Sequence, residues 1–120
     1  MPDPDTLRLD GERLTPEALD WAANGTAAVD LTDAGRARMA AARGLVDDAV
    51  DAGTPVYGVT TGLGARAGEA LDAASLAEFS ERTVHGRAHA AGSPLPRAVV
   101  RAAMIVRLNT LLRGGAAISP

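Results

Sequence analysis

The chain has 120 residues, enough for one small domain, and we predict a single domain over residues 1–120. It has a net charge of −3, no cysteine and no lysine, which excludes disulfide scaffolds and Walker-type phosphate loops and argues against nucleic-acid binding. No apolar run approaches the roughly 18 residues of a membrane helix, and the start, Met1 to Asp5, is acidic where secretion signals are basic. We therefore expect a cytoplasmic protein without a membrane partner.

The first part of the chain predicts a strand, a helix and a second strand. Residues 7–9 alternate as in a short strand and are followed by a turn signal, Asp10-Gly11. A helix then begins at Thr15, whose hydroxyl suits an N-cap before proline, and ends near residues 24–25. Residues 29–31 form a second extended piece that is a candidate partner for the first.

The middle of the chain predicts one long helix and then a glycine-rich interruption. The helix opens at residues 32–33, and Gly53 followed by Pro55 ends it. Residues 56–59 are expected to form a short strand, followed by irregular, glycine-rich chain as far as Gly68.

Two further helices complete the prediction. One runs from about Ala73 to the Gly-Ser-Pro at residues 92–94, and the last runs from near Pro96 to the glycines at 114–115. The last helix is apolar nearly all round, so it requires cover on more than one side. We expect Asn109 to bond to nearby main chain. The arginines of this region are expected to lie on its exposed edges: Arg97, Arg101, Arg107 and Arg113.

The composition limits the core that these elements can build. Alanine accounts for 26 residues, and there is one residue each of Trp, Tyr and Phe. Small side chains allow helices to pack at close range. A second chain would then supply the larger apolar side chains that such a core lacks. The fold class predicted from residues alone is therefore mainly α with a short β element.

Two motifs resemble functional sites but are weak. Residues 62–67 have the spacing of a dinucleotide fingerprint, but the βαβ unit that gives the fingerprint meaning is missing. Glu81, His85 and His89 are four residues apart and would share one helical face, which is a conceivable metal site. Gly86 interrupts that face and no fourth ligand is placed, so we expect no metal.

The segment around Tyr57 is the most unusual part of the sequence. From its residues alone, it is a short strand with Tyr57 half-buried, leading into a loop. Glycines at positions 58, 62 and 64 allow the loop to bring Tyr57 close to another surface or to move as a lid.

Taken in order, three segments resemble the N-terminal region of the aromatic amino acid ammonia-lyases and aminomutases. These enzymes act on histidine, phenylalanine or tyrosine with a methylidene-imidazolone (MIO) prosthetic group. The segments are Val56-Tyr-Gly-Val-Thr-Thr-Gly-Leu-Gly64, His89-Ala-Ala-Gly92 with Pro94-Leu95, and Val100-Arg-Ala-Ala-Met-Ile-Val-Arg-Leu-Asn-Thr-Leu-Leu-Arg-Gly114. The resemblance implies the N-terminal portion of a helical lyase fold with a glycine-rich tyrosine loop.

The resemblance also implies roles for individual residues. Tyr57 corresponds to the family's catalytic base, carried on a loop with Gly58, Gly62 and Gly64. His89 and its neighbour Ala88 correspond to the substrate side-chain pocket, which favours an aromatic ring with a polar tip. Leu63 belongs to the same substrate-binding region but stands where the family usually has phenylalanine.

The main departure concerns the prosthetic group. MIO forms from an internal Ala-Ser-Gly, and this tripeptide is absent, because Ala74-Ser75 is followed by Leu76 and Gly92 precedes Ser93. We therefore expect MIO on a larger lyase-like partner chain that carries Ala-Ser-Gly, with this chain as the small subunit of a hetero-oligomer. Two alternatives stay open: a non-catalytic assembly or regulatory protein that binds such a partner, and a piece of a longer enzyme.

Overall fold

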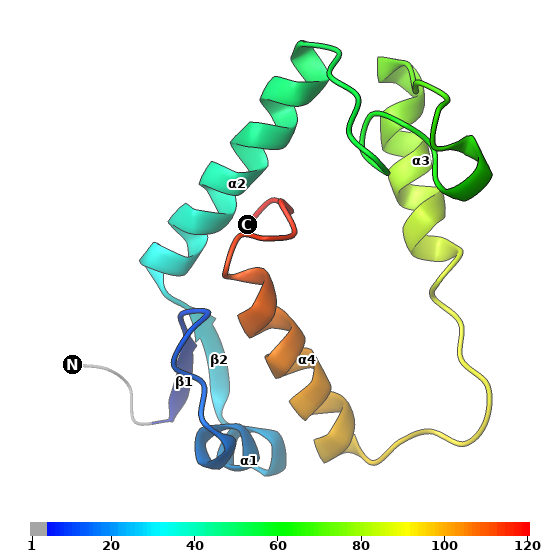
Figure 1. Ribbon diagram of the computed structural model, residues 1–120. Coiled ribbons are helices and arrows are strands. Elements are labelled where there is room, and N and C mark those ends of the chain that lie inside the picture. The colour runs from blue at the N-terminus through cyan, green and yellow to red at the C-terminus, as the bar shows by residue number, and fades with distance from the viewer. Residues whose placement is uncertain (1–4) are drawn as a thin grey trace. The chain divides into compact units, whose positions relative to one another are not determined.

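The computed structural model describes residues 5–120 and is mainly α-helical, as predicted. In chain order the elements are β1 (Thr6–Leu9), α1 (Pro16–Asn24), β2 (Ala28–Leu31), α2 (Asp33–Asp51), the short 3-10 helix η1 (Gly64–Arg66), α3 (Ala73–His85) and α4 (Arg97–Leu111) (Figure 1). Residues 1–4, which belong to the acidic start of the chain, lie outside the described part. Among the residues described, no helix combines the length and the apolar character that crossing a membrane requires.

The contacts of the chain divide it into two compact units. The first contains the described residues up to Gly44 together with Pro94–Pro120, and the second contains Leu45–Ser93. The first unit therefore joins the N-terminal strands to the last helix, while the second contains the glycine-rich loop and α3.

The first unit begins with a parallel strand pair. Leu7 lies opposite Val29 and Leu9 opposite Leu31, with α1 as the connection between the strands. The predicted start of α1 is confirmed, since the Thr15 hydroxyl accepts a hydrogen bond from the Ala18 amide at 3.2 Å. The pairing of the two predicted strands is confirmed as well.

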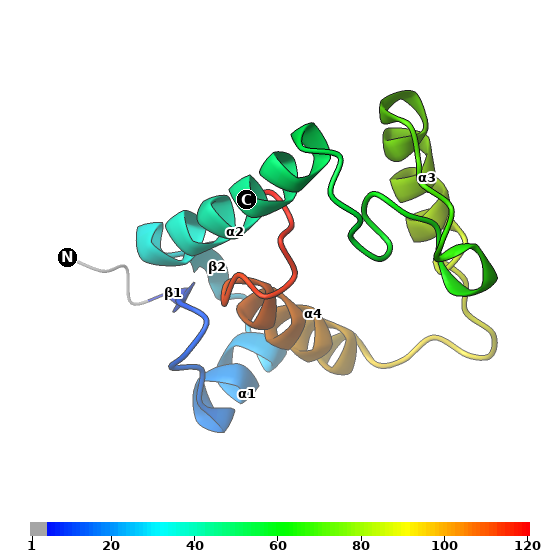
Figure 2. The same cartoon turned by 45° about the horizontal axis from the view of Figure 1, so that its top comes forward.

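The core of this unit consists of few large side chains. Its largest fully buried members are Leu9 and Leu112, and α1 packs against α4 (Figure 2). Packing is close because small residues allow it: a Cβ added at Gly35 of α2 would lie 2.9 Å from the Leu112 side chain. The buried set is Leu9, Ala22, Ala27, Met39, Ile105 and Leu112.

Two arginines tie distant parts of this unit together through main-chain carbonyls. Arg101 of α4 donates from Nε to the Ala22 carbonyl at 2.8 Å and from its terminal nitrogen to the Ala27 carbonyl. Arg38 of α2 donates in the same way to the carbonyls of Leu112, at 3.3 Å, and Asp10. The expectation that Arg101 lies on an exposed edge was wrong, because these carbonyls at and beyond the end of α1 attract its guanidinium.

Asn109 joins the end of the fold to its beginning. Its side-chain oxygen accepts from the Gly11 amide at 2.9 Å, which confirms that this mid-helix asparagine bonds to main chain. Gly11 has φ +88°, and a Cβ there would lie 3.2 Å from the Arg113 main-chain nitrogen. Glycine is therefore required both by conformation and by the close approach of the chain that directly follows α4.

Asp10 organises the turn that leads into this contact. Its carboxylate accepts from the amides of Arg13 and Glu12, each at 2.9 Å, and from the Arg13 side chain. The Arg13 amide first, then the Glu12 amide and the Arg13 guanidinium hold the pKa of Asp10 well below its ordinary value.

The predicted boundary of α3 was wrong. We expected this helix to continue to the Gly-Ser-Pro at 92–94, but it ends at His85, where the Gly86 amide bonds back to the Arg82 carbonyl. Glycine is a poor helix former, and the glycine and prolines that follow do not restart the helix before Arg97.

The Arg101 bonds give a first prediction. Arg101→Met keeps the length of the side chain and removes its donors, so the free energy of unfolding should fall by about 2 kcal/mol. Arg107→Met, an exposed position on the same helix, should change it by less than about 0.5 kcal/mol. Trp21 is the only tryptophan and lies in α1, so its fluorescence during urea unfolding reports on this unit. Equal effects from both variants would contradict the role of Arg101.

The Asp10 turn gives a second prediction, on pH dependence. A carboxyl whose folded-state pKa is lowered stabilises the fold above its ordinary pKa of about 3.9 and loses that effect as the pH falls through the lowered value. Stability should therefore decline below about pH 4. Asp10→Asn should make the decline shallower, measured by urea unfolding at a series of pH values. An unchanged slope would show that other groups cause the decline.

Candidate functional site

Tyr57 lies in a tight turn and not in a strand. Residues 57–60 form a turn, and the side chain is 64% exposed, so the predicted strand over residues 56–59 and the half-buried tyrosine were both wrong. Gly58 has φ +71°, a conformation incompatible with extended chain, and it starts the reversal directly after Tyr57. The phenol is therefore presented at the surface of the second unit.

The ends of this turn are joined by Thr60. Its hydroxyl accepts from the Val56 amide at 2.7 Å and donates to the Thr54 carbonyl at 2.6 Å. Its own amide donates to the Val56 carbonyl at 3.0 Å. Val56 and Thr60 thus share two hydrogen bonds that bracket Tyr57. Thr60 was not among the predicted site residues, although a threonine beside a turn commonly bonds to local main chain.

The second half of the loop folds back on the first. Thr61 and Ala70 form an antiparallel bridge, the Gly62 amide donates to the Glu69 carbonyl at 3.1 Å, and the Leu71 amide donates to the Thr60 carbonyl at 2.9 Å. The glycine-rich segment is therefore an ordered loop closed by main-chain hydrogen bonds.

The three loop glycines are required for different reasons. A Cβ at Gly58 would lie 2.9 Å from Leu63 Cδ2, so Leu63 packs directly over this position. Gly62 is in close contact with Arg66, whose carbonyl oxygen would be 2.6 Å from an added Cβ. Gly64 faces open space but has φ +57°. Close approach and positive φ explain these glycines without invoking mobility.

The phenolic oxygen has one main-chain partner. The Gly64 amide donates to the Tyr57 hydroxyl oxygen at 3.1 Å. This hydrogen bond links the tyrosine ring to the second half of the loop. The hydroxyl proton is free for another acceptor.

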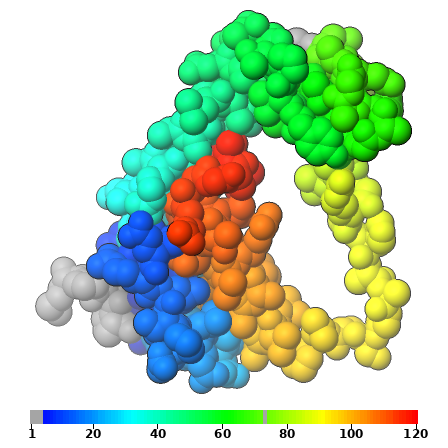
Figure 3. Space-filling view, viewed as in Figure 1, coloured from blue at the N-terminus to red at the C-terminus, as the bar shows by residue number. Residues whose placement is uncertain are grey.

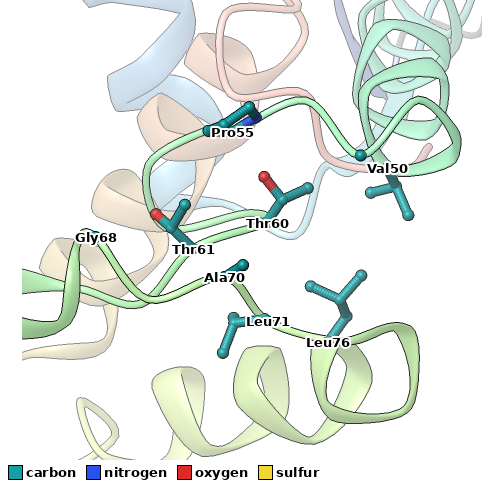
Figure 4. Close-up of a pocket in the computed structure, with 9 residues that line it drawn as sticks. Val50, Pro55, Thr60, Thr61, Gly68, Ala70, Leu71 and Leu76 are labelled. Carbon is teal, nitrogen blue, oxygen red and sulfur yellow. The ribbon is translucent and has the colours of Figure 1, made fainter.

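Behind the turn lies a small hollow of about 220 Å³ within the second unit (Figure 4). Pro55, Thr60 and Leu71 are among its lining residues, and the Thr60 oxygen turns toward the Pro55 segment (Figure 4). Tyr57 does not line this hollow.

The other predicted site residues lie beyond α3. Ala88 and His89 belong to the irregular chain after His85 and are exposed, and no hydrogen bond joins His89 to Tyr57 within residues 5–120. Because α3 ends early, His89 does not share a helical face with Glu81 and His85, which form an exposed pair at 3.6 Å. In the described chain no three acidic or histidine side chains group in a way that would hold a metal ion.

A family model for aromatic amino acid lyases matches residues 14–120. The chain belongs to the aromatic amino acid lyase family. It is 37% identical to a histidine ammonia-lyase of Stigmatella aurantiaca over 114 residues, which is 95% of this chain and 22% of that relative.

Solved lyase-family structures match the fold of the chain. Ergothionase from Treponema denticola, in complex with desmethyl-ergothioneine sulfonic acid, matches 95% of the chain at a TM-score of 0.88 and 28% identity. Tyrosine aminomutase from Streptomyces globisporus matches 94% at 0.85 and 30% identity. The chain covers 23% and 22% of these structures, so it spans about a fifth of its relatives. The expected N-terminal lyase portion is confirmed as the fold class.

The close contact at Gly62 of this lyase-family loop gives a third prediction. Gly62→Ala places a methyl group against the Arg66 main chain, which should destabilise the loop by about 1–3 kcal/mol. The Leu71 amide, which bonds to the Thr60 carbonyl, should then exchange its hydrogen faster. Gly68→Ala is the matched control, because a Cβ there meets nothing within 4 Å. Retained protection of Leu71 in Gly62→Ala would contradict the close packing.

Proposed function

We propose that this chain supplies Tyr57 as the catalytic base of a two-chain aromatic amino acid ammonia-lyase or 2,3-aminomutase. The observation that carries the proposal is the presentation of the phenol. In a member of the aromatic amino acid lyase family, the chain's only tyrosine is exposed on a hydrogen-bonded turn, with its oxygen held by the Gly64 amide.

The reaction class explains why a phenol is used. Elimination of ammonia from an amino acid requires removal of a β-proton of low acidity, and phenolate is a stronger base than imidazole or carboxylate. Tyr57 as phenolate takes this proton and the C–N bond breaks, which gives the unsaturated acid and ammonia. In the aminomutase variant the amine adds back at the β carbon. The Gly64 amide supports the oxygen while it is negatively charged.

The prosthetic group of the family cannot form from these 120 residues. No Ala-Ser-Gly is present in this sequence. When bound elsewhere in the assembly, MIO supplies the electrophile that activates the substrate amine. The proposal therefore includes a larger lyase-like chain that carries Ala-Ser-Gly, and the steps assigned to this chain are those of Tyr57 and its loop.

The surface of α4 supports a partner chain. A groove of about 740 Å³ runs along this helix in the first unit, and its lining includes Val29, Leu95, Val100, Met104, Leu108 and Leu111. Met104 is 67% exposed and Leu95 65%. In the space-filling view α4 (orange) has the N-terminal segment (blue) beside it (Figure 3). The last helix is thus only partly covered by its own unit.

The charge of α4 limits the kind of partner that fits. The helix contains arginines and no acidic residue, and Arg107, at the groove, makes no ion pair within residues 5–120. A helix with an apolar face and flanking carboxylates complements this surface.

The proposed substrate class rests on the relatives of the chain and on the residues assigned to the substrate pocket by resemblance. The relatives include histidine ammonia-lyase and tyrosine aminomutase, which act on imidazole and phenol side chains respectively. Ala88 and His89, with Leu63, are proposed to contact the substrate ring. The small Ala88 leaves room beside His89 for a polar-tipped ring.

The fourth prediction tests the base. The chain is expressed with a candidate larger subunit that carries Ala-Ser-Gly, and ammonia release from histidine and tyrosine is measured. Tyr57→Phe keeps the ring and removes the hydroxyl, so turnover should fall by at least about 10²–10⁴-fold. Pull-down of the larger subunit should be unchanged, because Tyr57 belongs to the second unit and the groove to the first.

A catalytic role and a non-catalytic assembly role of this chain give different results in this assay. Unchanged turnover in Tyr57→Phe would refute the assignment of the base. If the larger subunit were bound and active with either form of the chain, the non-catalytic assembly role would be supported instead.

A further inference from the structure

We propose that Thr60 is a positioning residue for Tyr57, because its side-chain hydroxyl closes the turn that presents the phenol. This inference rests on the proposed function of Tyr57 and adds a residue that acts through it. Thr60 is 8% exposed, and its hydroxyl donates and accepts hydrogen bonds within the loop.

The Thr60 hydroxyl donates one hydrogen bond and accepts another. A hydroxyl offers one donor, and here it is directed to the Thr54 carbonyl at 2.6 Å while the oxygen accepts from the Val56 amide at 2.7 Å. Both partners precede Tyr57 in the chain. The Thr60 amide also donates to the Val56 carbonyl, so the residues on either side of the turn are linked in both directions.

The main chain of Thr60 anchors the turn to the rest of the loop. Its carbonyl accepts from the Leu71 amide at 2.9 Å, beside the bridge between Thr61 and Ala70. Thr60 therefore connects the chain before Tyr57, through its side chain, to the returning chain at Leu71, through its carbonyl. No other side chain in the described residues bonds to both Thr54 and Val56.

Two further contacts connect the closed turn to the position of the phenol. Leu63 packs over Gly58, and the Gly64 amide reaches the Tyr57 oxygen at 3.1 Å, so the ring is held only if the two ends of the turn keep their spacing. Thr54 is exposed and Val56 half-buried. Their polar groups can bond to water when the Thr60 hydroxyl is removed, so the loss should displace the phenol and leave the unit folded.

The neighbouring threonine provides a matched control. Thr61 is equally buried, at 7% exposed, but its hydroxyl donates only to the carbonyl of Gly62, the next residue, at 3.2 Å. It makes no bond to the chain before Tyr57. The same substitution at both positions therefore separates turn closure from the general effect of replacing a buried threonine.

The first experiment uses the 120-residue chain and NMR. Thr60→Val is isosteric and removes the hydroxyl, so amide hydrogen exchange at Val56 and Gly64 should become about tenfold faster. Thr60→Ser should restore protection, and Thr61→Val should match the wild type. Tyr57 is the only tyrosine, so its ring signals report the displacement directly. Unchanged exchange at both amides in Thr60→Val would overturn the inference.

The second experiment uses the chain with its larger subunit. Thr60→Val should lower kcat by roughly 10²-fold with little change in KM, because a misplaced base affects the proton transfer more than substrate binding. Thr60→Ser should recover most of kcat. Full kcat in Thr60→Val, with Tyr57→Phe inactive, would overturn the positioning role alone. Full turnover in Tyr57→Phe would instead overturn the proposed function itself.

Discussion

Hydrogen bonds from side chains to main-chain carbonyls and amides hold this fold where its small core cannot. An alanine-rich chain buries few large side chains, so packing alone fixes the elements weakly. Arg38, Arg101 and Asn109 each reach main-chain groups far away in the sequence. Each bond satisfies a polar group near a helix end or turn that would otherwise need water. The first unit therefore depends on polar links between its N-terminal strands, α2 and α4.

The same principle operates on a smaller scale around Tyr57. Thr60 links the two ends of the turn, and the Gly64 amide holds the phenolic oxygen. Glycine is needed at the positions where chain segments touch or φ is positive. This arrangement presents a phenol to an external surface without burying it. The chain spans about a fifth of its lyase relatives, and within this span the phenol is exposed and held by main-chain groups.

Much of the fold could be predicted because local signals agreed with the final structure. The N-cap at Thr15, the long helix α2 and the two short strands followed from capping residues and from the spacing of apolar residues, while the parallel direction of the strand pair came from the structure. The errors came where local patterns are ambiguous. Residues 56–59 have strand-like composition, but the bonds to Thr60 and the positive φ of Gly58 create a turn instead. The helix α3 ends at His85, before the Gly-Ser-Pro at residues 92–94 where the sequence predicted its end.

The sequence by itself determined the family, the order of the helices and the identity of Tyr57, His89 and Ala88 as candidate site residues, because motifs and capping signals are local. Only the tertiary structure decided that Arg101 faces inward, that Thr60 closes the tyrosine turn and that the Gly64 amide meets the phenol. These features depend on groups brought together by folding. The partners of a hydrogen bond are set by positions in space, which one-dimensional spacing does not encode.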